Sequence, residues 1–217
     1  GKNLKLKKII NIIKNSDSEI IIFGENEFPF LMDDKNIISI QNFLKKDQHL
    51  IIGSSRKDSL NFFNSFYLIS KNNYQKFDKR ILVPFGEFIP FRHIFKFMTY
   101  IAGDNDFSKG KDQRYLKLDD NFSILPVICY EIIYFFNLIK TNNTNIIINI
   151  TNDSWFGDLL GPYQHFYFTK LRAAEFNKPI IRVSSNGISA LIDSNGFVNQ
   201  YIGLNKTNIK KIEVIKN

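Results

Sequence analysis

Four short runs of apolar, mostly β-branched residues constrain the fold of this chain more than any other feature. They are EIIIFG at 19–24, HLIIGSS at 49–55, NIIINIT at 145–151 and PIIRVSS at 179–185. A strand that is apolar on both faces must be covered on both faces, which is typical of sheets flanked by helices. The spacing of apolar residues predicts helices over 4–15, 34–46 and 162–176 between these strands.

Shorter or more polar strands are predicted to complete the set. They are FFNSFYLIS at 62–70, a strand ending at Phe77, RYLKL at 114–118, FSILPVIC at 122–129, ISALID at 188–193 and NIKKIEVI at 208–215. A helix is predicted to follow Cys129 through IIYFFNLIK at 132–140, and Asn186-Gly187 predicts a hairpin turn. The class is therefore α/β or mixed α+β. With short connections, the 217 residues are expected to form one domain.

Composition excludes several classes of protein. Apolar residues make up 44% and charged residues 23%, which is typical of a globular domain. The net charge of +8 is spread along the chain without a long basic block, so nucleic acid is not an expected partner, whereas an anionic membrane surface fits the charge. No apolar run approaches the roughly 18–20 residues that span a bilayer. With one cysteine and three widely separated histidines, neither a disulfide nor a metal site is expected, and no cofactor is expected.

Cys129 is the candidate nucleophile. It ends the apolar run ILPVIC, and a helix is predicted to begin just after it. A thiol at such a turn would feel the positive end of the helix dipole, which predicts a lowered pKa. The alternative is a buried core cysteine. Glu131 favours the functional interpretation, because a core strand seldom carries a charge so close to a cysteine.

Two further charged residues are candidates for the same site. Glu25 comes directly after a buried strand, where active sites of α/β sheets gather, although Glu27 competes for the role and a solvated loop is the alternative. Lys79 lies in FDKRILVPFGEFIPF, a segment rich in aromatic residues and proline that also holds Glu87. Charges in so apolar a segment indicate a cleft; the alternative is an ordinary surface pair.

The order Glu25, Lys79, Cys129 resembles the Glu-Lys-Cys triad of the nitrilase, or carbon–nitrogen hydrolase, superfamily. LVPFGEFIPF, ICYE and NDSWFGDLLGPYQHF at 152–166 resemble, more specifically, the apolipoprotein N-acyltransferase family. The resemblance runs from about residue 19 to 195. The family usually has Trp-Pro-Glu at the acid, whereas this chain has Phe23-Gly24-Glu25. Pro29 follows four residues after Glu25, as in the family, and favours Glu25 over Glu27.

The resemblance implies a nitrilase-like α-β-β-α sandwich over residues 1–217, lacking the family's first strand. It also implies a fragment of a longer protein of the bacterial inner membrane, with this domain facing the periplasm. The expected donor is a phospholipid, and the expected acceptor is the N-terminal diacylglyceryl-cysteine of an apolipoprotein.

The resemblance assigns a role to each candidate residue. Glu25 would act as general base, Cys129 as nucleophile, and Lys79 with the backbone N–H of Tyr130 would stabilise the oxyanion. Glu87 and Glu131 would orient Lys79.

Three other features carry predictions. The aromatic segment 88–103, with Arg92, His93 and Lys96, is interpreted as a lipid-facing lid or as a core helix. His165 is expected to be structural. Arg172 and Glu175, three apart on a predicted helix, are expected to form a weak ion pair.

Two alternative functions stay open. One is a soluble amidase or nitrilase that uses the same triad; the Arg usual near its nucleophile does not occur between Cys129 and Lys140. The other is an inactive remnant of the fold.

Overall fold

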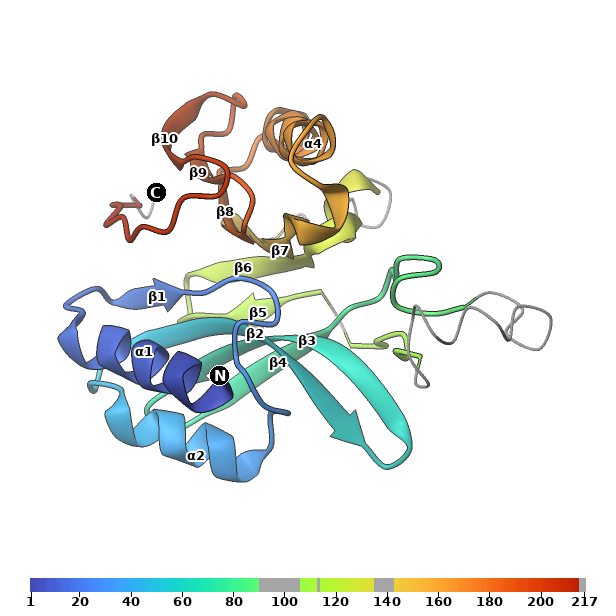
Figure 1. Cartoon of the computed structure of the whole chain (residues 1–217). Coiled ribbons are helices and arrows are strands. Elements are labelled where there is room, and N and C mark those ends of the chain that lie inside the picture. The colour runs from blue at the N-terminus through green and yellow to red at the C-terminus, as the bar shows by residue number, and fades with distance from the viewer. Residues whose placement is uncertain (90–105, 113, 135–142, 215–217) are drawn as a thin grey trace.

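The computed structural model describes residues 1–89, 106–112, 114–134 and 143–214. Two β-sheets pack face to face between two layers of helices (Figure 1). The N-terminal elements are α1 (Lys2–Asn15), β1 (Ile20–Ile22), α2 (Asp34–Phe43), β2 (His49–Asp58), β3 (Asn61–Ser70) and β4 (Tyr74–Asp78). The later elements are β5 (Leu116–Lys117), β6 (Ser123–Ile128), the 3-10 helix η2 (Cys129–Ile133), β7 (Ile146–Asn152), the 3-10 helix η4 (Asp153–Phe156), α4 (Gly161–Phe176), β8 (Ile180–Ser185), β9 (Ser189–Ile192) and β10 (Val198–Ile202).

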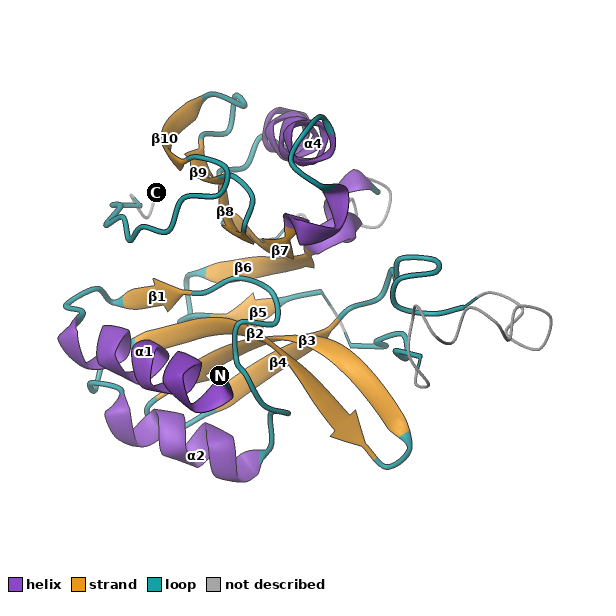
Figure 2. Cartoon of the chain, in the orientation of Figure 1, coloured by secondary structure: helices purple, strands orange, loops and turns teal. Residues whose placement is uncertain are grey.

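The first sheet has the order β1-β2-β3-β4 and carries α1 and α2 on its outer face (Figure 2). β1 pairs parallel with β2, and the other pairs are antiparallel. Successive side chains of a strand alternate between its faces. Leu50 and Ile52 therefore pack under the helices, while Ile51 between them packs toward the second sheet.

The second sheet has the order β10-β9-β8-β7-β6-β5, in which β6, β7 and β8 run parallel. Its outer face is covered by α4. In β7, Ile147 packs on that outer side, and Ile146, Ile148 and Ile150 pack toward the first sheet. The continuous apolar runs thus cover both faces of each central strand, as the sequence predicts, and the α-β-β-α class is confirmed. The missing first strand stays a prediction.

Near the C-terminus one predicted strand is wrong and one strand was missed. The described part of NIKKIEVI, residues 208–214, forms no strand; Ile212 and Val214 pack against the inter-sheet core without pairing in a ladder. The edge strand β10 was not predicted, because its three central residues are exposed and leave no apolar run.

Two other predictions fall partly on residues that the structure does not describe. The helix after Cys129 is the short η2, and the rest of its predicted range, residues 135–140, lies outside the described residues. The proposed lid lies outside them from residue 90 to 103.

Candidate active site

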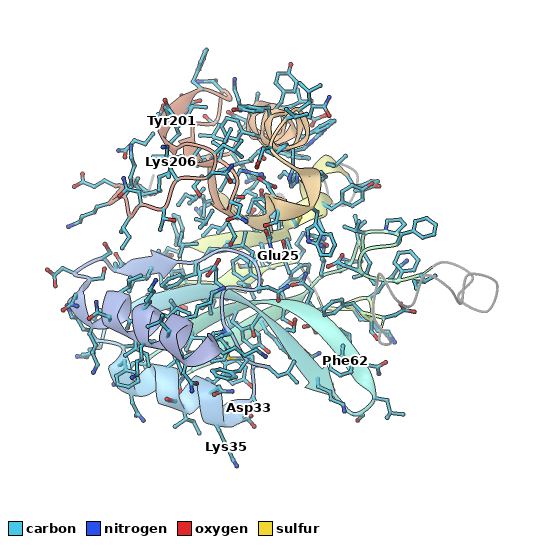
Figure 3. The ribbon with its side chains drawn as sticks, in the orientation of Figure 1. Glu25, Asp33, Lys35, Phe62, Tyr201 and Lys206 are labelled. Carbon is cyan, nitrogen blue, oxygen red and sulfur yellow. The ribbon has the colours of Figure 1, made fainter. Side chains whose placement is uncertain are left out.

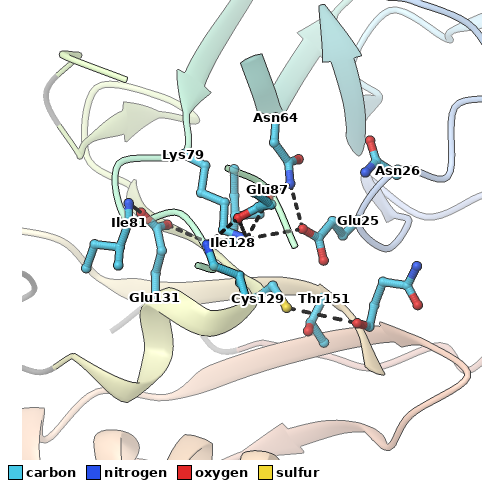
Figure 4. Close-up of polar contacts among 12 residues, drawn as sticks. Glu25, Asn26, Asn64, Lys79, Ile81, Glu87, Ile128, Cys129, Glu131 and Thr151 are labelled. Carbon is cyan, nitrogen blue, oxygen red and sulfur yellow. Dashed lines mark hydrogen bonds and ion pairs between the residues drawn. The ribbon is translucent and has the colours of Figure 1, made fainter. Parts of the chain in front are cut away.

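Glu25 lies between the two sheets (Figure 3), where it meets Lys79 and Cys129 (Figure 4). Glu25 follows β1, Lys79 follows β4 and Cys129 follows β6. β1 and β4 point the same way, so their carboxyl ends lie at one edge of the first sheet. All three side chains are buried, and Lys79 Nζ lies 3.5 Å from Glu25 Oε1. The three residues that the sequence singled out therefore do form one cluster.

Close backbone packing fixes the turn that carries Glu25. The N–H of Gly53 donates to the carbonyl of Gly24, and a Cβ on Gly53 would lie 2.7 Å from the Cα of Glu25. A Cβ on Gly24 would lie 2.8 Å from Ser185 Oγ. Ser185 thus occupies the space that a side chain at position 24 would need. This gives a steric reason for glycine at the position where the family usually has proline. Glu27 binds Lys5 and Ser185 and so turns away from Lys79.

Glu87 contacts Lys79 directly, as predicted. Its two carboxylate oxygens lie 3.0 and 2.9 Å from Lys79 Nζ, and Oε2 also accepts from the backbone N–H of Val83. Burial alone would lower the pKa of Lys79, but the charges of Glu25 and Glu87, and that of Cys129 when it ionises, raise it above its usual value. Lys79 is therefore a permanent cation inside the site.

Asn64 on β3 belongs to the site and was missed by the sequence analysis. Its Nδ2 donates to Glu25 Oε1 at 2.7 Å and to Glu87 Oε1 at 2.9 Å, and its backbone carbonyl accepts from the N–H of Lys79. One amide group thus holds the two carboxylates on either side of Lys79. The available signal was a polar residue inside the strand FFNSFYLIS, where the buried positions are otherwise mostly apolar.

Glu131 acts on the site differently from the prediction. It makes no contact with the amine of Lys79 among the described contacts; it accepts from the backbone N–H groups of Arg80, Ile81 and Ile128. Arg114, which the sequence analysis did not identify, donates to both oxygens of the same carboxylate at 2.8 and 2.6 Å. Burial would raise the pKa of Glu131, but Arg114 lowers it, so this carboxylate is charged. It joins the loop after Lys79 to the end of β6.

Cys129 occupies a strained turn. Its φ of 48° lies in the left-handed region that residues with a side chain rarely adopt. The predicted lowering of its pKa is wrong: burial first, and then the charge of Glu25, raise the pKa of the thiol to about 12, against the effect of Lys79. Since η2 has only five residues, its dipole is too small to offset burial. The resting thiol is protonated and needs a base.

Glu25 has the properties of that base. Burial raises the pKa of its carboxyl, Lys79 opposes the shift, and Glu87 adds to it. A carboxylate with a raised pKa accepts a proton more readily than an ordinary one. The thiol lies within hydrogen-bonding reach of this carboxyl and also faces the carbonyl of Asn152 at 4.0 Å.

The remaining predicted residues lie beside this cluster. Tyr130 follows Cys129 in η2, and its hydroxyl accepts from Tyr134 at 2.8 Å. His165 is buried beneath Cys129, and Arg172 pairs with Glu175 as predicted. Within the described residues, no group of three His, Cys, Asp or Glu side chains could hold a metal ion.

Comparison with known proteins gives the family. The family described as carbon–nitrogen hydrolase matches residues 4–209. An apolipoprotein N-acyltransferase of Allorhizobium ampelinum is 34% identical over 96% of this chain and 42% of its own length. One from Rickettsia typhi is 41% identical over 70% of this chain and 31% of its own length. The chain therefore spans less than half the length of these relatives.

Solved structures with the same fold are more distant in sequence. A nitrilase-superfamily member of Saccharomyces cerevisiae has a TM-score of 0.70 at 13% identity, over 95% of this chain and 82% of its own. A CN-hydrolase superfamily protein of Xanthomonas campestris has a TM-score of 0.66 at 15% identity, over 95% of this chain and 82% of its own length. These likenesses show the fold, and the match over residues 4–209 shows that the chain belongs to the carbon–nitrogen hydrolase family.

Proposed function

We propose that this chain is the catalytic domain of an apolipoprotein N-acyltransferase, in which Cys129 carries the acyl group as a thioester. The observation that supports the proposal most is the buried thiol beside a carboxyl of raised pKa and a permanently charged amine. The similarity to relatives of that name supplies the class of substrate. The acyl donor is then a phospholipid, and the acceptor is an apolipoprotein.

The first half-reaction transfers the acyl group to the enzyme. Glu25 removes the proton from the Cys129 thiol, and the sulfur attacks the ester carbonyl of the phospholipid. Negative charge develops on the carbonyl oxygen, where Lys79 and the backbone N–H of Tyr130 stabilise it. The ester C–O bond then breaks, and the leaving alkoxide of the lysophospholipid takes the proton from Glu25. A thioester on Cys129 remains.

The second half-reaction transfers the acyl group to the lipoprotein. Glu25 removes a proton from the N-terminal amine of the diacylglyceryl-cysteine as its nitrogen attacks the thioester carbonyl. The same oxyanion donors stabilise the intermediate. The C–S bond breaks, an amide is formed, and the thiolate takes its proton back from Glu25. The base carboxylate is regenerated, so both halves balance without a cofactor.

In this proposal Glu87 and Asn64 hold Lys79 and Glu25 in place, and Glu131 holds the backbone on both sides of the site. The proposal places the domain at the periplasmic face of the bacterial inner membrane, as one part of a longer membrane protein. Among the described helices, none combines the length and apolar character needed to cross a bilayer.

Intact-mass measurement after incubation with phospholipid tests the proposal. We expect wild-type protein to gain the mass of one acyl chain, and hydroxylamine, which cleaves thioesters, to remove it. Cys129→Ala should gain nothing. Cys129→Ser should keep the fold but gain little acyl mass. Serine is a weaker nucleophile than cysteine unless a base is positioned for its hydroxyl. Acylation that persists in Cys129→Ala would contradict the assignment, and turnover of small amides without acylation by lipid would favour a hydrolase instead.

A further inference from the structure

A second buried polar cluster lies beneath the turn of Cys129, and the proposed mechanism does not use it. It consists of Asp153 from η4, His165 from α4 and Arg182 from β8, and their side chains are 1%, 2% and 0% exposed. Ionisable groups so far from water are costly unless each is paired and hydrogen-bonded. The contacts of this cluster therefore indicate what it supports.

His165 joins the cluster to the candidate nucleophile. Its Nδ1 lies 2.8 Å from Asp153 Oδ1, and its Nε2 lies 3.2 Å from the carbonyl oxygen of Cys129. A carboxylate and a carbonyl can only accept hydrogen bonds, so both ring nitrogens must donate to satisfy both contacts. Only the imidazolium form makes both hydrogen bonds at once. A neutral ring that carries its proton on Nε2 still donates to Cys129, with Nδ1 facing Arg182 Nη2 at 3.3 Å.

Asp153 is the neighbour of His165 that favours protonation of the ring. Burial would raise the pKa of the Asp153 carboxyl, but His165 and Arg182 lower it to about 2, so Asp153 is an anion. Arg182 Nη2 donates to Asp153 Oδ2 at 2.6 Å, and Ser184 Oγ donates to the same oxygen at 2.9 Å. Burial and Arg182 lower the pKa of His165, and the Asp153 carboxylate opposes that shift. The pKa of His165 stays below its usual value, so the second ring proton is gained only on acidification, and Asp153 is the neighbour that favours it.

Close packing holds the cluster in one geometry. A Cβ on Gly187 would lie 1.8 Å from Asp153 Oδ2, so only glycine lets the β8–β9 connection approach this carboxylate. On another side, the ring of Phe156 packs against the imidazole with centroids 5.2 Å apart. His165 has little freedom to point anywhere but toward Cys129.

Cys129 is the residue that needs such support. Its left-handed φ of 48° is unfavourable for a residue with a side chain and persists only where the surroundings impose it. A donor fixed against its carbonyl oxygen restrains the orientation of the peptide that follows the cysteine. That peptide also carries the Tyr130 N–H, the proposed oxyanion donor.

We infer that His165 is a positioning residue for the nucleophile: oriented by Asp153, it donates from Nε2 to the carbonyl of Cys129 and holds the strained turn. The inference takes Cys129 as the reactive thiol of the proposed function. It can be tested without acyl transfer, because Cys129 is the only cysteine of the chain.

Alkylation of Cys129 by iodoacetamide, followed by intact mass, measures the reactivity of this thiol directly. His165→Gln is the conservative variant, since its amide nitrogen can take the place of Nε2 and donate to Cys129. His165→Asn is the matched control, since its amide reaches only the position of Nδ1. Asp153→Asn keeps the ring but removes the group that orients it. Thermal unfolding of each variant shows whether the fold is kept.

We expect His165→Asn and Asp153→Asn to slow alkylation by roughly tenfold or more, on the scale of a displaced reacting group, and His165→Gln to stay within about threefold of wild type. Equal rates in wild type and His165→Asn, or equal losses in the Gln and Asn variants, would overturn the inference. Should a variant fail to fold, nitrogen-15 NMR of the wild-type protein decides. The inference requires a proton on His165 Nε2, and an unprotonated Nε2 throughout the pH range of the folded protein overturns it.

Discussion

At the scale of single residues, Lys79 is distinguished by three negative or potentially negative neighbours that keep it charged despite burial. Its proposed task is to stabilise the oxyanion. We therefore expect Lys79→Ala to lower the acylation rate by about 10²-fold or more, the scale of a lost oxyanion donor. Lys79→Arg should not restore the rate, because a planar guanidinium does not replace a compact ammonium.

Arg80→Ala is the matched control for this measurement, since Arg80 is the exposed cation next in sequence. It should acylate at the wild-type rate. A normal rate in Lys79→Ala, or a loss only in Arg80→Ala, would show that the charge at the oxyanion comes from elsewhere.

Asn64 contributes to the proton affinity of Glu25. Its hydrogen bond lowers the pKa of Glu25, against the larger effect of burial, which raises it. The proposed base is active above its pKa, so acylation should decrease as the pH falls through that value. Asn64→Leu should raise the pKa further and shift this acidic limb to higher pH. Asn61→Leu, three residues earlier on the same strand, should leave this acidic limb unchanged. Identical pH profiles of acylation for the two variants would show that Asn64 does not influence Glu25.

At the scale of elements, Glu131 joins two segments far apart in the chain. Its carboxylate accepts from backbone N–H groups after Lys79 and before Cys129, while Arg114 neutralises it. Removing one partner of a buried ion pair costs about 3–5 kcal/mol. We expect Glu131→Gln to lower the free energy of unfolding on that scale. Glu175→Gln should change it by less than about 1 kcal/mol, because Glu175 forms a partly exposed pair with Arg172.

The pH dependence of stability gives this prediction a second readout. The pKa of Glu131 is lowered in the folded protein, so its contribution is present above the unfolded pKa and is lost as the pH falls through the folded pKa. The difference in the free energy of unfolding between wild type and Glu131→Gln should therefore shrink as the pH falls. A constant difference between the two proteins at all pH values would mean that the carboxylate is not charged.

The elements also show which parts of the fold and the site can be predicted from the sequence. Runs such as NIIINIT and HLIIGSS predicted buried strands correctly, because burial on both faces leaves a continuous apolar signal. β10 has mostly exposed residues, so its sequence carries no such apolar signal. Asn64 and Arg114 were missed for another reason: each acquires its role through partners many positions away, and only the fold brings those partners together.

The same limit applies to the pKa of Cys129. A strand-to-helix turn predicted a lowered value, but the size of the opposing burial effect depends on tertiary packing. The resemblance of Glu25, Lys79 and Cys129 to the family triad identified the cluster. Each of the three follows a strand, and the three strand ends meet between the sheets.

At the scale of the whole molecule, exposed apolar side chains gather where the chain leaves the site. Trp155, Leu159, Leu160 and Tyr163 are 76%, 81%, 72% and 53% exposed, within a dozen residues of Asn152, whose carbonyl faces the thiol of Cys129. Exposed apolar side chains grouped in this way mark sites that bind partners or lipid. If the acyl donor is a phospholipid, this segment is suited to contact the bilayer beside the site.

We therefore expect the protein to float with phospholipid vesicles, and Leu159→Asp together with Leu160→Asp to weaken this flotation. Each apolar side chain buried in the bilayer contributes roughly 1.5–3 kcal/mol, so losing two should reduce binding by more than tenfold. Leu60→Asp with Phe197→Asp is the matched control, since these side chains are 91% and 69% exposed but lie on other elements. Phe95→Asp with Phe97→Asp tests the predicted lid in the same assay. Retained flotation in both the Leu159/Leu160 and the Phe95/Phe97 variants, with the fold intact, would mean that neither segment contacts lipid. The phospholipid donor would then rest on the likeness to its relatives alone.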